Sequence, residues 1–145
     1  MTTDEQATRV WTGLRSVLLD LEDRKREVSQ ALDMSFVRAK ALRRLATSPL
    51  SMRALAQELS TDAPYTTIVV DDLERRGLVT RTVNPDDKRT KVVTATSAGL
   101  AVAATAQEIL DRPPAALLSL PARDLAALDR IVAVLLKDLG VGSPT

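Results

Sequence analysis

Hydrophobic and polar positions follow two different periods along this chain. Over most of the sequence apolar residues recur every three or four positions, which predicts helices over residues 5–30, 35–47, 51–59, 64–76 and 98–111, and a last helix from about residue 121 onward. Residues 78–96 differ, because two runs rich in Val and Thr flank a charged segment at 84–90. That pattern predicts a β-hairpin. The predicted fold class is therefore mainly α with a small β-hairpin wing (α+β).

The ends of the predicted helices carry residues that favour starting or stopping a helix. Ser51 is a good N-cap, and Pro64 stands in a first turn, where its missing N–H costs nothing. Gly77 is suited to the left-handed position that follows a helix. A short helix, a turn over residues 60–63 and a second helix make a helix-turn-helix, and the hairpin that follows makes it a winged one.

The predicted helices at both ends of the chain are too apolar for one small winged domain to bury. Such a domain needs only about 60–70 residues by typical module size, which here corresponds to residues 35–96. We therefore predict that residues 1–34 and 97–145 form a helical dimerisation region, because two-fold dimers are the commonest oligomers. A helical bundle within one chain is the alternative. Residues 140–145 are expected to fray.

Composition narrows the chemistry that the chain can perform. The 145 residues include no Cys and no His. Disulfides and thiol redox sensing are thereby excluded, and the commonest general base and metal ligand are missing. The acidic residues fall where they cap helices or pair along them, so we expect no catalytic residue, no metal site, no cofactor and no enzyme. No apolar run approaches the roughly 20 residues that a membrane span needs, so we expect a cytoplasmic protein without a membrane partner.

The distribution of charge is more informative than the net charge of +1. Residues 34–60 carry five basic side chains and one acidic side chain, whereas residues 1–33 carry five basic and seven acidic ones. The basic excess coincides with the start of the predicted helix-turn-helix, where contact with phosphates would need it. A solvated helix face explains the same charge equally well.

Candidate DNA contacts lie on the second helix of the helix-turn-helix and on the hairpin. Arg89, at the hairpin tip, is the strongest, because an arginine can enter a narrow minor groove. Asp87 is expected to pair with a basic neighbour and shape the tip. Ile68 is an apolar residue on the exposed face and is suited to a thymine methyl, with packing against a neighbouring helix as the alternative. The predicted set is Arg53, Ala63, Pro64, Tyr65, Thr67, Ile68, Arg75, Arg81, Asp87, Lys88, Arg89 and Lys91.

Two acidic residues on the same helix have a structural interpretation. Asp71 and Asp72 would repel phosphates, so we expect them to act within the helix. Their spacing predicts i,i+4 pairs with Arg75 and Arg76, each worth a few tenths of a kcal/mol. Arg43 or Arg44, on the predicted helix at 35–47, is a further candidate to hold a phosphate.

Three motifs in this order resemble the MarR family of bacterial transcriptional regulators. They are Asp-Asp-Leu-Glu-Arg-Arg-Gly-Leu-Val at 71–79, Asp-Lys-Arg at 87–89 and Thr-Ser-Ala-Gly at 96–99, with Ala95 where the family usually has Leu. The resemblance covers nearly the whole chain. It implies a winged helix-turn-helix homodimer that binds double-stranded DNA at a pseudo-palindromic operator, mostly as a repressor. It also implies a possible small-molecule effector, often phenolic or lipophilic, that releases the DNA.

The resemblance also assigns roles to individual residues. It makes Arg89 the minor-groove arginine, with Asp87 as its support. The reading surface is made of Ala63, Pro64, Tyr65, Thr67 and Ile68. Relatives bind effectors near the positions of Trp11, Met34, Phe36 and Arg43. The alternative function is a winged-helix module that binds a protein, in which Arg89 would meet an acidic patch of that partner and genomic DNA would yield no consensus sequence.

Overall fold

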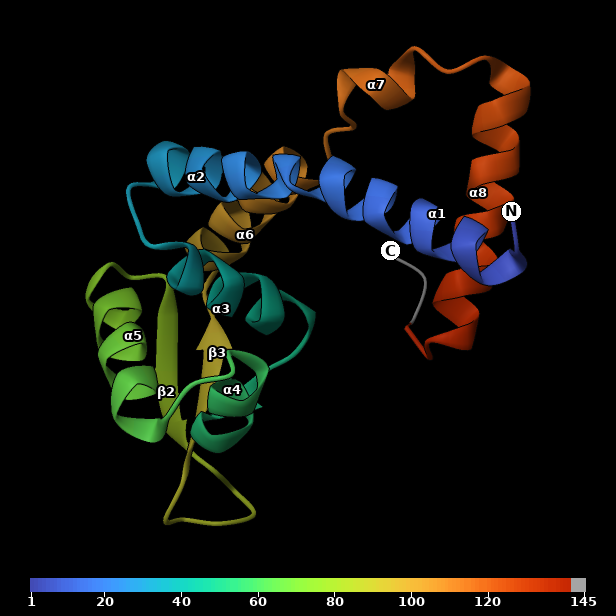
Figure 1. The fold of residues 1–145 in the computed structure, drawn as a ribbon. Helices are drawn as coiled ribbons and strands as arrows, with labels where there is room; N and C mark the ends of the chain where they lie inside the picture. Colours follow the sequence, from blue (N-terminus) through green and yellow to red (C-terminus); the bar gives the residue numbers. More distant parts are fainter. Residues whose placement is uncertain (142–145) are drawn as a thin grey trace. The chain divides into compact units, whose positions relative to one another are not determined.

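A computed structural model describes residues 1–141, apart from the side chains of residues 20–22 (Figure 1). The predicted fraying at the C-terminus falls mainly on residues 142–145, which lie outside the described residues. The chain divides into two compact units, residues 1–111 and 112–145. The first unit contains α1 (Thr3–Leu18), α2 (Asp20–Leu32), α3 (Phe36–Thr47), β1 (Leu50–Ser51), α4 (Met52–Glu58), α5 (Ala63–Arg75), β2 (Val79–Val83), β3 (Lys91–Ala95) and α6 (Ser97–Asp111). The second contains α7 (Ala115–Leu118) and α8 (Ala122–Asp138). The predicted fold class is confirmed.

The sheet is antiparallel, in the order β1-β3-β2. The predicted hairpin forms β2 and β3, which pair with Arg81 opposite Val93. Two main-chain hydrogen bonds close the tip, because the N–H of Asn84 donates to the carbonyl of Thr90 at 2.9 Å and the N–H of Thr90 to that of Asp87 at 3.0 Å. β1 was not predicted, since a strand of two residues is too short to show an alternating pattern.

The helix-turn-helix begins and ends as its capping residues predict. The Ser51 hydroxyl accepts a hydrogen bond from the N–H of Ala54 at 3.0 Å. Asp62, which the sequence pattern placed only in a polar turn, caps α5 by accepting from the N–H of Tyr65 at 2.8 Å. Gly77 follows α5 with φ of +74°, a left-handed conformation that a side chain would strain.

Two predictions about helices were wrong. The single helix expected over residues 5–30 is divided into α1 and α2 at Leu19. Leu19 keeps right-handed helical dihedrals and no Pro or Gly stands there, so the break leaves no signal in the sequence. The short helix α7 was also missed, because four residues after Pro114 carry no helical period.

An aliphatic core holds the first unit together. Helices α3, α4 and α5 each turn an apolar face inward, and their most deeply buried side chains include Leu42, Leu55, Val69, Val70 and Leu73. Helix α6 contributes small side chains to this core. Ala103 and Ala106 are buried, whereas Ala101 and Thr105 are exposed.

The base of the hairpin is packed tightly against α6. A Cβ atom at Gly99 would lie 2.0 Å from the carbonyl oxygen of Leu78, so only glycine allows this approach. Thr96 reinforces it, because its hydroxyl donates to the carbonyl of Gly77 at 2.8 Å and its N–H to that of Leu78 at 3.0 Å. These contacts fix the base of the hairpin against α6.

Helices α2 and α6 share the core of the winged helix. Val28 of α2 and Ala106 of α6 are fully buried within it. Contacts therefore divide the chain after Asp111, whereas the sequence-based division places the winged domain at 35–96. The assignment of residues 1–34 and 97–145 to dimerisation remains a proposal.

Two of the longer helices, and the short α7, contain no fully buried residue. Neither α1 nor α8 contains a buried residue. Their exposed large apolar side chains are Val10, Trp11, Val17 and Leu18 on α1, and Leu125, Ile131, Val132, Val134 and Leu135 on α8. None of the helices in the described part of the chain is both long and apolar enough to cross a membrane.

Candidate nucleic-acid interface

A groove of about 780 Å³ lies between α4, the first turns of α5 and the hairpin. Its lining residues are Met52, Arg53, Ala56, Gln57, Thr61, Ala63, Thr66, Thr67, Arg81, Arg89, Thr90 and Lys91. Four of these are basic and none is acidic, so the groove favours an anion. It brings together six of the predicted DNA-contacting residues, namely Arg53, Ala63, Thr67, Arg81, Arg89 and Lys91.

The hairpin tip presents Arg89 to solvent. The side chain of Arg89 is 90% exposed, and its Nε donates to Oδ1 of Asp87 at 3.2 Å. The main-chain N–H of Arg89 donates to the same oxygen at 3.1 Å. These bonds from Arg89 lower the pKa of the Asp87 carboxyl. The predicted pairing of Asp87 is therefore confirmed, and it orients an exposed guanidinium. Lys88, beside it, is also exposed.

The first two turns of α5 form an uncharged surface. Ala63, Pro64, Tyr65, Thr67 and Ile68 are all exposed. Ile68 is 56% exposed, so packing within this chain does not take up its side chain. The hydroxyl of Thr67 donates back to the carbonyl of Ala63 at 3.1 Å and keeps an acceptor lone pair for another group.

Arg81 is held between two carboxylates. Its Nη2 lies 2.6 Å from Oδ1 of Asp71 and 3.1 Å from Oε1 of Glu74. The hydrogen bond with Glu74 is the main cause that raises the pKa of Arg81 and lowers that of Glu74. The predicted Asp71–Arg75 pair is therefore wrong, because β2 brings Arg81 to Asp71. Arg81 lines the groove with its charge already paired.

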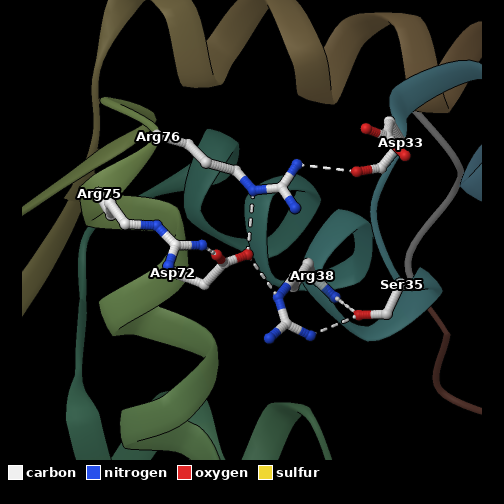
Figure 2. A network of polar contacts seen from close by, with 6 residues as sticks. All are labelled: Asp33, Ser35, Arg38, Asp72, Arg75 and Arg76. Atoms are coloured by element: carbon white, nitrogen blue, oxygen red, sulfur yellow. Dashed lines mark hydrogen bonds and ion pairs between the residues drawn. The ribbon is translucent and has the colours of Figure 1, made fainter.

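Asp72 lies at the centre of a cluster of arginines (Figure 2). Its side chain is 11% exposed and binds Nε of Arg38 at 2.8 Å and Nε of Arg76 at 3.0 Å. Arg75 also pairs with Asp72. The predicted Asp72–Arg76 pair is confirmed. Arg38, which comes from α3, covers Asp72, and nothing in the spacing of the sequence connects the two residues.

The cluster reaches beyond α5 to the turn between α2 and α3. Nη1 of Arg38 donates to the Ser35 hydroxyl, the N-cap of α3, at 2.9 Å. Nη1 of Arg76 donates to the carbonyl of Asp33 at 2.8 Å, where Asp33 ends α2 with φ of +49°. We call Asp33, Ser35, Arg38, Asp72, Arg75 and Arg76 the Asp72 cluster. It ties α5 to α3 and to the end of α2 (Figure 2).

None of the four residues predicted near an effector site lines the groove. These residues are Trp11, Met34, Phe36 and Arg43. Trp11 is 58% exposed on α1, and Met34 is buried in the core. Lys25 lies 5.4 Å from the ring centre of Phe36. Arg43 donates to Gln107 at 2.8 Å, and burial, followed by the charge of Arg44, lowers the pKa of Arg43. Met34, Phe36 and Arg43 therefore make contacts within the chain that have a structural role, whereas Trp11 is exposed.

Arg53 and Arg44, two further candidates for contact with phosphates, have different surroundings. Arg53 is exposed and lines the groove. Arg44 pairs with Glu58 of α4 at 3.4 Å, so it fastens α3 to α4. Within the described residues no three acidic, His or Cys side chains are grouped as a metal site would require.

Comparison with protein families identifies this winged segment. Residues 32–90 match the model of the MarR family. This segment is similar to the MarR family. The match spans α3, β1, α4, α5, β2 and the hairpin tip, so it includes Arg89 and every residue that lines the groove except Lys91. A comparison with curated protein sequences gave no significant match.

Solved structures share the MarR-family fold over almost the full chain. A MarR family protein from Bacillus stearothermophilus is 20% identical, with a TM-score of 0.80 over 97% of this chain and 99% of that one. The YusO protein from Bacillus subtilis is 19% identical, with a TM-score of 0.73 over 94% and 99%. A point mutant of MepR from S. aureus, solved bound to an oligodeoxyribonucleotide, is 19% identical, with a TM-score of 0.67 over 90% and 97%.

Proposed function

We propose that this protein is a sequence-specific, DNA-binding transcriptional regulator, a homodimeric repressor that binds a pseudo-palindromic operator. The basic groove between α4, α5 and the hairpin carries the proposal. It joins a helix whose first turns are exposed to a hairpin whose tip presents an exposed arginine. An α-helix fits the major groove of B-DNA, and an arginine fits its minor groove.

The proposed contacts divide by type. Residues 63–65, 67 and 68 at the start of α5 face the base edges in the major groove, since the N-terminal residues of a recognition helix contact bases. Arg89 enters the neighbouring minor groove, with Asp87 holding it. Arg53, Lys88 and Lys91 contact phosphates, which position the protein without carrying sequence information. Arg81 leaves this set, because two carboxylates hold its guanidinium and its side chain is only 21% exposed, against 90% for Arg89. Arg75 leaves it because it is the last residue of α5, far from the first turns, and pairs with Asp72.

A DNA-bound relative supports the proposal. The MepR mutant that shares this fold was solved with an oligodeoxyribonucleotide. The groove residues of this chain supply the chemistry that such a complex requires, which is basic charge around an exposed helix end. A regulator of this kind acts on DNA inside the cell, and we therefore propose a cytoplasmic location.

Exposed apolar side chains support the dimer. Residues such as Trp11 on α1 and Leu135 on α8 are 58% and 47% exposed in one chain. Pairing with a second copy would remove this surface from water, at about 25 cal/mol for each Å² buried. The two-fold axis of that dimer would match the symmetry of a palindromic operator. We therefore keep residues 1–34 and 97–145 as the proposed dimerisation region.

Selection of genomic fragments with the purified full-length chain tests the function. We expect the bound fragments to share a pseudo-palindromic consensus, with half-sites about 10–10.5 base pairs apart, centre to centre, in footprints. Bound fragments without a consensus, or no bound fragments, would contradict the proposal and favour the protein-binding alternative. A single isolated half-site would contradict the symmetric dimer.

Release by a small molecule is the finer part of the proposal and rests on the family resemblance. The same selection, repeated with a panel of phenolic and lipophilic compounds, tests it. An effector should lower the yield of operator fragments without lowering recovery of the protein. An unchanged yield with every compound would contradict effector release by these two classes.

A further inference from the structure

The charged residues of α5 lie in its second half, away from the proposed reading surface. The exposed residues of the first two turns, at positions 63–65, 67 and 68, carry no charge and no amide side chain. Guanine is usually recognised by Arg or Lys, and adenine by Asn or Gln. The start of α5 offers neither kind of group to a base edge.

The charged groups farther along α5 are occupied. Asp71 and Glu74 pair with Arg81, and Asp72 pairs with Arg75. Arg75 also lies twelve residues beyond Ala63, which is roughly 18 Å along the helix axis. A guanidinium at that end would not reach the bases that the first turns approach.

Ile68 is the large apolar side chain that this surface leaves in water. It is 56% exposed, and Tyr65, one turn before it, is 36% exposed. The only apolar group that base pairs present in the major groove is the C5-methyl of thymine. The polar edge of cytosine or guanine against Ile68 would instead lose water without gaining a hydrogen bond.

We propose that Ile68 selects thymine in each operator half-site through its C5-methyl group, so that α5 distinguishes bases mainly by apolar contact. This inference rests on the proposed function, because it names the base that the DNA-binding surface reads. It assigns the choice of sequence to Ile68 and leaves affinity to Arg89 and the phosphate contacts.

Replacing thymine by deoxyuridine tests this directly, because the exchange removes only the methyl group. Operator duplexes with one deoxyuridine at each thymine position in turn would be measured against wild type, Ile68→Ala and Val83→Ala at one salt concentration. Val83 is the matched control, since it is β-branched and also 56% exposed, but lies in β2. The quantity compared is the ratio of the two dissociation constants, thymine against uracil, for each variant.

We expect one or two positions in each half-site where loss of the methyl weakens wild type roughly fourfold, as burial of one methyl group predicts. The same ratio should fall to one in Ile68→Ala and stay unchanged in Val83→Ala. The inference is overturned if no position shows a ratio above one, or if Ile68→Ala keeps the ratio. It is also overturned if 7-deazaguanine substitution weakens wild type and that loss disappears in Arg53→Ala, because α4 would then read the bases. Absence of any operator binding would overturn the proposed function itself.

Discussion

The Asp72 cluster and the hairpin tip each contain an Asp–Arg ion pair, but the pair is largely buried in the cluster and largely exposed at the tip. In the cluster, the side chain of Asp72 is 11% exposed and that of Arg38 is 18% exposed. At the tip, the side chain of Asp87 is 40% exposed and that of Arg89 is 90% exposed. Both pairs join a guanidinium Nε to a carboxylate oxygen, at 2.8 Å in the cluster and 3.2 Å at the tip.

The difference in burial separates a structural role for the Asp72 cluster from the proposed DNA-binding role of the hairpin tip. Ions that are partly removed from water depend on each other, and removal of one leaves the other charge uncompensated. The Asp72 cluster therefore fixes α5 against α3. An exposed pair contributes little to stability because water and salt screen it. The guanidinium of Arg89 can therefore leave Asp87 and bind between the phosphates of a DNA groove at a small cost in free energy. This property suits the proposed contact with DNA.

The packed base of the hairpin should show the largest effect. Gly99→Ala places a Cβ 2.0 Å from the carbonyl of Leu78, and relieving this clash requires a shift of α6. We expect a loss of about 3 kcal/mol in the free energy of unfolding, measured by urea denaturation. Gly13→Ala is the control, because a Cβ at Gly13 meets nothing within 4 Å. It should stabilise α1 by about 0.5–1 kcal/mol, and equal effects at both sites would contradict the packing described.

Substitution of Asp72 and of Asp87 should give the next largest difference in the free energy of unfolding. Asp72→Ala leaves Arg38 half-buried without its carboxylate, and we expect a loss of about 2 kcal/mol in the free energy of unfolding. Asp87→Ala should leave that free energy unchanged within error. Urea denaturation at one fixed protein concentration measures both, since a dimer's stability depends on concentration. A larger loss for Asp87→Ala than for Asp72→Ala would reverse the comparison.

The smallest effect concerns pH at the tip. The hydrogen bonds from Arg89 lower the pKa of Asp87 below its ordinary value, so the folded state prefers the ionised carboxylate. The stabilisation is complete above the pKa of the unfolded chain and is lost as the pH falls through the lowered pKa of the folded state. Carboxyl titration by NMR should show the pKa of Asp87 rising towards its ordinary value in Arg89→Ala. An unchanged titration of Asp87 in that variant would show that the pair does not form in solution.

Local patterns predicted most of the fold and the outer part of the site. Ser51, Gly77 and the charged segment between two Val- and Thr-rich runs are signals contained within a few residues. Each was confirmed, because caps, turns and hairpins depend on neighbouring positions. The pairing of Asp87 with Arg89 is of the same kind.

Contacts between distant segments were not predictable in this way. Arg38 meets Asp72 across 34 positions, and β2 carries Arg81 to Asp71. Helix spacing assigned Asp71 to Arg75 instead, because spacing describes one helix and not the element packed against it. The break at Leu19 and the two-residue strand β1 were missed for a simpler reason, since neither changes the hydrophobic period.

The salt dependence of operator binding in Arg89→Ala and Arg75→Ala tests the central claim, that the hairpin tip binds DNA while the Asp72 cluster supports the helix. The two arginines are matched, because both pair with an aspartate and their side chains are 90% and 75% exposed. We expect Arg89→Ala to weaken binding at least roughly tenfold and to reduce the slope of log K against log salt by about one. Arg75→Ala should leave both the affinity and the slope close to wild type. The same loss of affinity and slope in both variants, or a loss in Arg75→Ala alone, would contradict the account.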